Sequence, residues 1–248
     1  MPHGFAVYQH EGEILLKSLD TNSPPVRIAQ SGSFPRFSPD GTQVAFVGSN
    51  RIMLANCDGT GLRALADARK GKAVAFHPNG NEVLFTDGEY IKAVTISNGS
   101  VRIVASGYRF QGMDVSPDGS LLVTTVRSMG VSIRLFDLVN GGSRSLMTGC
   151  SASFSPDGEL VTCNQNDHSR LNIIQHSTGK NVGSVSAPAG MKFDNQFWSN
   201  DPDWLVSVSE GPAQDIFIHH AASNLYFRVT GTGNCDRPDL FIAKGTRP

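Results

Sequence analysis

The five residues Phe37-Ser38-Pro39-Asp40-Gly41 return three more times along the chain, and most of the architecture follows from that recurrence. The later copies are Phe76-His77-Pro78-Asn79-Gly80, Val115-Ser116-Pro117-Asp118-Gly119 and Phe154-Ser155-Pro156-Asp157-Gly158. Their prolines stand at positions 39, 78, 117 and 156, a constant step of 39 residues. A degenerate fifth copy, Trp198-Ser199-Asn200-Asp201-Pro202, follows after a slightly longer step. A period of this length indicates a repeat protein.

Each copy has the chemistry of a tight turn between two strands. Proline presets φ for position i+1 of a type I turn, aspartate is suited to position i+2, and the following glycine takes a left-handed backbone. An aromatic or β-branched residue ends the segment before the turn, and an alternating apolar segment such as Gln43–Val47 begins after it. Each copy therefore predicts a β-hairpin.

The remainder of each repeat supplies two more strands. In the first complete repeat these are Ile52–Ala55 and Leu62–Leu65, joined by a turn at Asp58-Gly59-Thr60-Gly61. Four short antiparallel strands in about 39 residues are typical of one blade of a β-propeller. No segment between the repeats has the pattern of a helix or a linker. The sequence therefore predicts an all-β propeller of four-stranded antiparallel blades in a single domain over residues 1–248.

The two ends of the chain predict how the ring closes. Residues 5–30 contain three strand patterns, Phe5–Gln9, Glu13–Ser18 and Val26–Ala29, with no Ser-Pro-Asp-Gly strand before them. The C-terminal segment Arg237–Ala243 supplies one strand and no hairpin of its own. Together they would form one shared blade, which removes exposed strand edges. The expected six blades are about 5–30 plus 235–243, 33–66, 72–105, 110–147, 150–187 and 193–230.

The recurring aromatic-Ser-Pro-Asp-Gly pattern, with its alternating strand and Asp-Gly turn, resembles the WD40-like PD40 repeat of TolB-type β-propellers. The resemblance covers nearly the whole chain and is clearest in residues 33–158. It identifies the class of repeat rather than a biological role. TolB itself has a separate α/β domain before its propeller and a periplasmic leader. Related propellers also occur in prolyl oligopeptidase-like enzymes, tricorn-type proteases and oligogalacturonate lyases, so the fold does not fix the function.

Charge and hydropathy narrow the class of partner. The 21 Lys and Arg residues and 22 Asp and Glu residues give a net charge of −1, which argues against a nucleic-acid binder. No apolar run approaches the roughly 18 residues of a membrane span, so we expect no membrane insertion. We also expect a monomer. The N-terminus carries no secretory signal, which predicts a cytoplasmic protein, or a periplasmic one if a leader has been removed.

The sequence contains no recognisable motif for catalysis or metal binding. The sequence has no G-x-S-x-G nucleophile motif, phosphate-binding loop or dinucleotide fingerprint. The cysteines form no C-x-x-C pair and are expected to be reduced thiols; they are Cys57, Cys150, Cys163 and Cys235. His219 and His220 are adjacent on a strand and should point to opposite faces. We therefore predict no catalytic residue, no metal and no cofactor, and the histidine cluster of oligogalacturonate lyases is not recognisable.

The apolar residue near the end of each inner strand is here called the anchor; the six anchors are Phe37, Phe76, Val115, Phe154, Trp198 and Leu240. The residue before each anchor is expected to face the central channel. These positions are Arg36, Ala75, Asp114, Ser153, Phe197 and Asp239. One interpretation is structural: a water-filled channel with an Arg36–Asp239 ion pair between neighbouring blades. The other is functional: a polar pocket in which Arg36 grips a ligand carboxylate, helped by Asp114, Asp239 and Ser153.

The loops at one end of the channel offer a second candidate surface. They contain aromatic and arginine side chains, which suit protein binding, and we single out Tyr108 and Arg109. The other residues expected on this face are His10, Arg69, Lys70, Glu89, Arg127, Met129, His168 and Lys192. The first hypothesis is a non-catalytic scaffold that binds a protein or peptide at the channel mouth. The alternative is a small-molecule enzyme, of the sugar lyase or hydrolase type, with its site in the channel.

Overall fold

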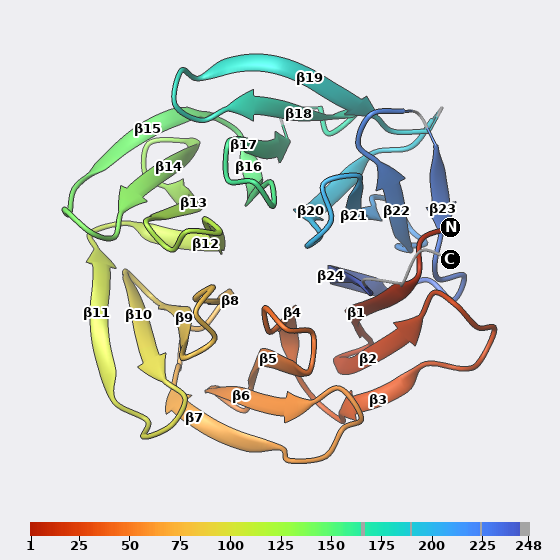
Figure 1. Cartoon of the computed structure of the whole chain (residues 1–248), viewed down its shortest axis with the longest axis horizontal. Helices are drawn as coiled ribbons and strands as arrows, with labels where there is room; N and C mark the ends of the chain where they lie inside the picture. The colour runs from red at the N-terminus through yellow and green to blue at the C-terminus, as the bar shows by residue number, and fades with distance from the viewer. Residues whose placement is uncertain (165–166, 189, 224, 244–248) are drawn as a thin grey trace.

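Six four-stranded antiparallel sheets stand around a central axis in the computed structural model, which describes residues 1–164, 167–188, 190–223 and 225–243 (Figure 1). The strands nearest the axis are β24, β4, β8, β12, β16 and β20. The predicted six-bladed propeller is confirmed. Within the described residues, no helix has the length and apolar character needed to cross a membrane.

The sheets follow the chain order with one exception. Five of them are formed by consecutive strands: β4 (Ser33–Phe37), β5 (Gln43–Gly48), β6 (Arg51–Asn56) and β7 (Arg63–Asp67); β8 (Val74–Phe76), β9 (Glu82–Asp87), β10 (Tyr90–Thr95) and β11 (Val101–Ser106); β12 (Arg109–Val115), β13 (Leu121–Arg127), β14 (Val131–Asp137) and β15 (Ser143–Thr148); β16 (Cys150–Phe154), β17 (Leu160–Asn164), β18 (Arg170–Gln175) and β19 (Lys180–Ser186); β20 (Phe193–Trp198), β21 (Trp204–Ser209), β22 (Ile216–His220) and β23 (Tyr226–Arg228). The sixth joins β24 (Cys235–Ile242) to β1 (Gly4–His10), β2 (Glu13–Ser18) and β3 (Val26–Ala29).

The C-terminal strand closes the ring as the sequence predicts. β24 pairs antiparallel with β1, with Phe5 opposite Phe241 and Ala6 opposite Leu240. The pairing begins two residues before the expected Arg237, at Cys235. Figure 1 shows the red and blue ends of the chain meeting in this sheet.

Apolar side chains fill the spaces between sheets. Phe46, Phe85 and Leu122 are among the largest side chains with essentially no exposed surface. They stand on the second strands of three blades, where residues alternate between the two faces of the sheet. Burial of such a side chain contributes roughly 1.5–3 kcal/mol, so the contacts between sheets hold the ring together.

A bulge interrupts each inner strand except β8. In four of the five bulged strands, the residue three positions before the anchor has a left-handed backbone; these residues are Phe34 (φ 57°), Ser151 (φ 55°), Asn195 (φ 49°) and Arg237 (φ 52°). A bulge breaks strict alternation and redirects the neighbouring side chains. All four residues lie near the end of the channel at which the inner strands begin, here called the mouth.

Candidate functional site

A cavity of about 730 Å³ opens at the mouth. Its walls come from the inner strands, from the loops that lead into them and from adjacent parts of β13, β14 and β17. Arg36, Met113 and Phe197 line it furthest along the inner strands, and the bulge residues lie nearer the mouth. Ligand cavities in proteins have volumes of roughly 300–1,000 Å³, so this one has room for a small molecule or for a peptide segment.

Arg36 is bound to three other channel residues. Its Nε lies 3.3 Å from Asp239 Oδ2, and its Nη2 lies 3.2 Å from Asp114 Oδ1. The guanidinium carbon stands 3.7 Å from the ring centroid of Phe197. The predicted Arg36–Asp239 pair is therefore present. Arg36 also reaches Asp114, two blades away, past the small side chain of Ala75 on β8.

The other polar channel residues bond to the backbone of the next blade. In three places the side chain before one anchor accepts the N–H of the following anchor, and these bonds are Asp239 to Phe37 (2.8 Å), Asp114 to Phe154 (2.9 Å) and Ser153 to Trp198 (3.0 Å). Ser153 Oγ also donates to Asp114 Oδ2 at 2.8 Å. Burial raises the pKa of Asp239, and the facing Arg36 guanidinium opposes that rise.

These contacts favour the structural interpretation of the channel. Asp239 and Ser153 are buried, and Arg36 exposes only 12% of its side chain. Of the four channel residues singled out as ligand-binding candidates, only Arg36 lines the mouth cavity. Asp114, Asp239 and Ser153 instead form hydrogen bonds with residues of neighbouring blades. A ligand carboxylate would compete with the two aspartates for Arg36.

Tyr108 and Arg109 do not form one site. Tyr108 packs edge-on against Phe110 and Phe136, with the Arg134 guanidinium 4.8 Å from its ring centroid, so it belongs to a partly buried aromatic cluster. Arg109 is exposed and lines a second, more open hollow of about 1,010 Å³ beside the first. That hollow also contains Arg69, Lys70 and Lys72.

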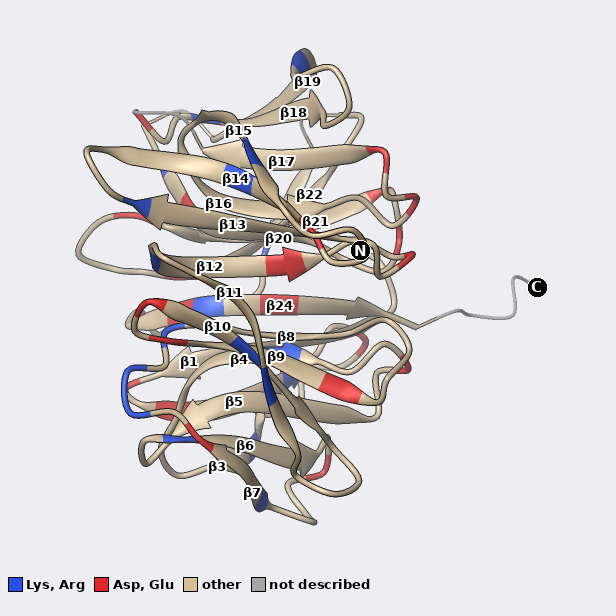
Figure 2. Cartoon of the chain, turned by 90° about the vertical axis from the view of Figure 1, so that its left-hand side faces the viewer, with Lys and Arg blue, Asp and Glu red and all other residues tan. Residues whose placement is uncertain are grey.

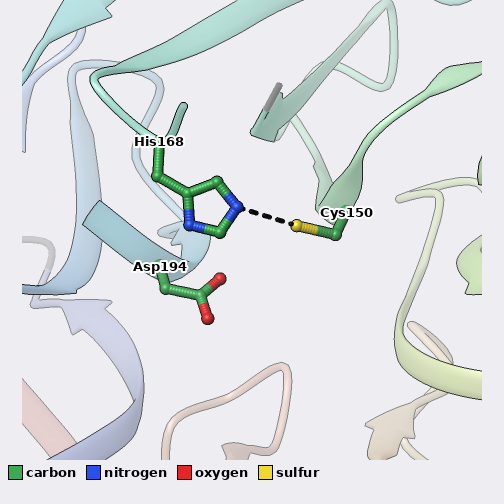
Figure 3. A group of neighbouring side chains, drawn as sticks. All are labelled: Cys150, His168 and Asp194. Atoms are coloured by element: carbon green, nitrogen blue, oxygen red, sulfur yellow. Dashed lines mark hydrogen bonds between the residues drawn. The ribbon is translucent and has the colours of Figure 1, made fainter. Parts of the chain in front are cut away.

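A side-chain cluster that sequence reasoning missed lies at the mouth, where Cys150, His168 and Asp194 converge. Cys150 begins β16, His168 lies between β17 and β18, and Asp194 lies on β20 of the next blade. One possible ligand atom from each lies within 4.8 Å of those from the other two. Figure 3 shows the three side chains turned toward a common space, with Cys150 Sγ 3.5 Å from His168 Nε2.

Local backbone geometry builds this cluster. Gly149 precedes Cys150 with φ 144°, and a Cβ at that position would lie 2.4 Å from the carbonyl oxygen of Asn164. Glycine thus allows β16 to begin close against β17. His168 itself has a left-handed backbone (φ 55°), and its carbonyl accepts the N–H of Phe193, which fixes the loop against β20.

Surrounding groups orient the three side chains. His168 Nδ1 is hydrogen-bonded to Glu210 Oε1, which leaves Nε2 facing Cys150. Asp194 Oδ1 accepts bonds from Ser151 Oγ at 2.9 Å and from the N–H of Asn195 at 2.8 Å. Within the described residues no hydrogen bond is made by Asp194 Oδ2. The cluster therefore presents one ring nitrogen, one sulfur and one carboxylate oxygen.

Basic side chains without a carboxylate partner mark one sector of the mouth. Lys72 and Arg127 line the cavity and are exposed, and neither forms an ion pair within the described residues. Arg69, Lys70 and Arg109 line the neighbouring hollow together with the carboxylates of Asp67, Asp87 and Glu89. In Figure 2, the loops at one edge of the molecule carry Lys and Arg together with Asp and Glu, whereas the turns at the opposite edge are mostly acidic.

Comparisons with known proteins define the class. No family model matches the sequence, and no curated protein matches it. TolB from Acinetobacter baumannii matches with a TM-score of 0.77 and 18% identity over 96% of this chain, which spans 66% of that protein's length. A putative TolB from Agrobacterium tumefaciens gives 0.73 and 13%, covering 95% of this chain and 91% of that one. A nidogen/laminin complex gives 0.79 and 11%, covering 95% and 97%.

The chain therefore has the fold of TolB-type six-bladed β-propellers, as the resemblance implied. Identities this low establish the fold and do not transfer a function. The assignment of its repeats to the PD40 class stays a prediction.

Proposed function

We propose that this chain is a non-catalytic scaffold that binds an acidic segment of a partner protein across the channel mouth. The observation that carries the proposal is the pair of exposed cations, Lys72 and Arg127, at a cavity of about 730 Å³. Some surface cations elsewhere, such as Arg51 and Arg102, have carboxylate partners. Others, such as Arg144 and Lys180, form no ion pair within the described residues but do not line this cavity. A cation that has no carboxylate partner within its own molecule can pair with a carboxylate of another molecule.

The shape of the surface supports a segment rather than a flat partner. The mouth cavity adjoins a second hollow, and Gly71 and Lys72 line both. A chain lying along the two would pass Arg127 and Lys72 before reaching Lys70 and Arg109. Arginine is enriched at protein interfaces because its planar group binds carboxylates in two-pronged fashion.

The fold itself is compatible with this function. One structure of the same fold is a nidogen/laminin complex, so the architecture occurs in a protein–protein complex. The mouth offers side chains from several blades at once, because every inner strand begins there. The residues that bind would then stand on rigid strands and short loops, and little ordering would be needed on association.

A random peptide library displayed on phage tests the proposal. We expect selection on the purified chain to enrich peptides rich in Asp and Glu, with affinities that fall as salt rises because the charges are exposed. The Lys72→Glu/Arg127→Glu variant should bind the selected peptides at least about tenfold more weakly, equivalent to ~1.4 kcal/mol. The matched control, Arg144→Glu/Lys180→Glu, makes the same charge change on the outer strands β15 and β19.

Equal losses in the two variants would contradict a mouth site. Enrichment of no peptide at all would favour the alternative, a small-molecule enzyme of the sugar lyase or hydrolase type that uses the same cavity.

A further inference from the structure

We propose that Cys150, His168 and Asp194 form a binding site for a divalent transition metal, with Zn²⁺ the best-matched ion, and that its fourth coordination position opens into the mouth cavity. The proposal does not depend on the function proposed above. It stands on the donor atoms, their spacing, the groups that orient them and the charge around them.

The donor atoms and their spacing suit zinc. Thiolate sulfur, imidazole nitrogen and carboxylate oxygen are its three usual protein ligands. A tetrahedral ion with Zn–S of about 2.3 Å and Zn–N of about 2.0–2.1 Å holds the sulfur and nitrogen roughly 3.5 Å apart. Cys150 Sγ and His168 Nε2 are 3.5 Å apart, and all three donor atoms lie within 4.8 Å of one another. Small rotations of the side chains would bring all three to one ion.

The surrounding hydrogen bonds are those that metal ligands require. A metal-binding histidine commonly donates its second ring N–H to a carboxylate, which fixes its tautomer and points the free lone pair at the metal. Glu210 accepts from His168 Nδ1 in this way. Asp194 is held through Oδ1 by Ser151 and Asn195, while Oδ2 makes no hydrogen bond within the described residues. Both ligands are thus oriented before any ion arrives.

Charge distinguishes a cation site from a catalytic thiol. A nucleophilic cysteine needs a positive surrounding that stabilises its thiolate. Cys150 instead has the carboxylates of Asp194 and Glu210 among its charged neighbours, with Arg127 as the cation beside it. Two carboxylates beside a thiol attract a cation, and a bound Zn²⁺ displaces the thiol proton.

The position of the cluster leaves the ion accessible. All three residues line the mouth cavity, and each side chain is partly exposed. Structural zinc sites are closed by four protein ligands, whereas a site with three ligands keeps one position for water or another molecule. We therefore infer that the ion would present a Lewis-acidic centre to the contents of the cavity, such as a carboxylate oxygen.

Calorimetric titration of tag-free, chelator-treated protein with Zn²⁺ tests the site. We expect one ion per chain at a strong site, and at least a tenfold weaker affinity in Cys150→Ser and in His168→Asn. Cys57→Ser is the matched control, because that thiol is also partly buried and donates only to the carbonyl of Gly41. It should leave the affinity unchanged. Circular dichroism of each variant establishes that it is folded.

Cobalt supplies a readout that a misfolded variant cannot imitate. Co²⁺ bound by a thiolate gives an intense sulfur-to-metal charge-transfer band, which we expect in the wild-type chain and in Cys57→Ser but not in Cys150→Ser. Zn²⁺ should also protect Cys150 from alkylation by iodoacetamide. The proposal is overturned if the cobalt complex lacks that band, if Cys57→Ser binds as weakly as Cys150→Ser, or if Zn²⁺ leaves the alkylation rate of Cys150 unchanged.

Discussion

Asp239 Oδ2 accepts the backbone N–H of Phe37 at 2.8 Å, although the two residues are 202 positions apart in the sequence. The bond joins the last strand of the chain to the first complete blade, at the seam where the ring closes. Its counterparts, Asp114 with Phe154 and Ser153 with Trp198, make the same link between later blades. Polar residues at the axis thus act as connectors from one blade to the next.

Arg36 compensates the negative charge of Asp114 and Asp239 near the axis. It lies against both Asp114 and Asp239, and neither carboxylate has another cation within hydrogen-bonding reach in the described part of the chain. Removing one partner of a buried ion pair leaves an uncompensated charge, which typically costs about 3–5 kcal/mol.

We therefore expect Arg36→Ala to lower the free energy of unfolding by about 3–5 kcal/mol, as measured by urea denaturation at neutral pH. Arg36→Lys should recover only part of this loss, because one ammonium group cannot face both carboxylates and the ring of Phe197. Arg51→Ala is the control: its pair with Asp67 is exposed and should contribute at most about 1 kcal/mol.

An Arg36→Ala variant as stable as the wild type, yet deficient in peptide binding, would reverse the structural interpretation of the channel. It would also restore Arg36 as the ligand-binding residue that its place in the repeat suggests.

Truncation after Gly231 tests closure of the ring. It removes β24, whose Leu240 and Ile242 are buried against β1 and the neighbouring blade. Each such side chain contributes roughly 1.5–3 kcal/mol, and Asp239 is lost with them, while a whole domain is stable by only about 5–15 kcal/mol. We expect the shortened chain to be unfolded or aggregated in size-exclusion chromatography. A monomer with an unchanged Tm would contradict this closure.

The fold could be predicted because the information is local and repeated. Each Pro-Asp-Gly turn sets its own hairpin, and the constant step of 39 residues sets the blades. The Arg36–Asp239 pair could also be predicted, because both residues precede an anchor in a strand that lines the channel. The alternation of side chains along a strand then predicts that both residues point into the channel.

The cluster of Cys150, His168 and Asp194 could not be predicted in the same way. Cys150 and Asp194 lie next to bulges at Ser151 and Asn195, where alternation fails, and His168 lies in a loop of no repeated length. The three residues come from two blades and have no motif spacing. The one signal available was that Cys150 and Asp194 stand at equivalent positions, four residues before the anchors Phe154 and Trp198.

Because of His219, the free energy of unfolding should depend on pH between pH 6.5 and about pH 3. This side chain is buried beside Phe193, with Nε2 2.8 Å from Ser207 Oγ, and burial lowers its pKa from 6.5 to about 3. The unfolded chain therefore binds a proton in this window that the folded chain does not, so stability falls as the pH falls. A shift of this size corresponds to a few kcal/mol, at about 1.4 kcal/mol per pKa unit.

We expect His219→Gln to be less stable than the wild type at pH 7 but to lose less on acidification to pH 4, as followed by thermal melts. Parallel curves for the wild type and His219→Gln would mean that this imidazole accepts its proton in the folded state.

The repeated turns should make the stability of the fold depend on pH a second time, at lower pH than His219 does. Asp40, Asp118 and Asp157 each accept a bond from the serine two residues earlier, and these bonds lower the pKa of all three, that of Asp118 to about 2. The ionised carboxylates therefore stabilise the fold above the unfolded pKa of 3.8, and this contribution is lost as the pH falls toward 2.

One natural copy already has Asn79 in place of the aspartate, so the turn itself tolerates an amide. We expect the triple variant Asp40→Asn/Asp118→Asn/Asp157→Asn to fold, to melt below the wild type at pH 7, and to approach it as the pH falls toward 2, because the wild-type carboxylates take up protons over that range. Asp203→Asn is the control on the same edge, since Asp203 accepts no hydrogen bond through its carboxylate within the described residues. A difference in Tm that stays constant from pH 7 to pH 2 would show that the serine–aspartate bonds do not depend on charge.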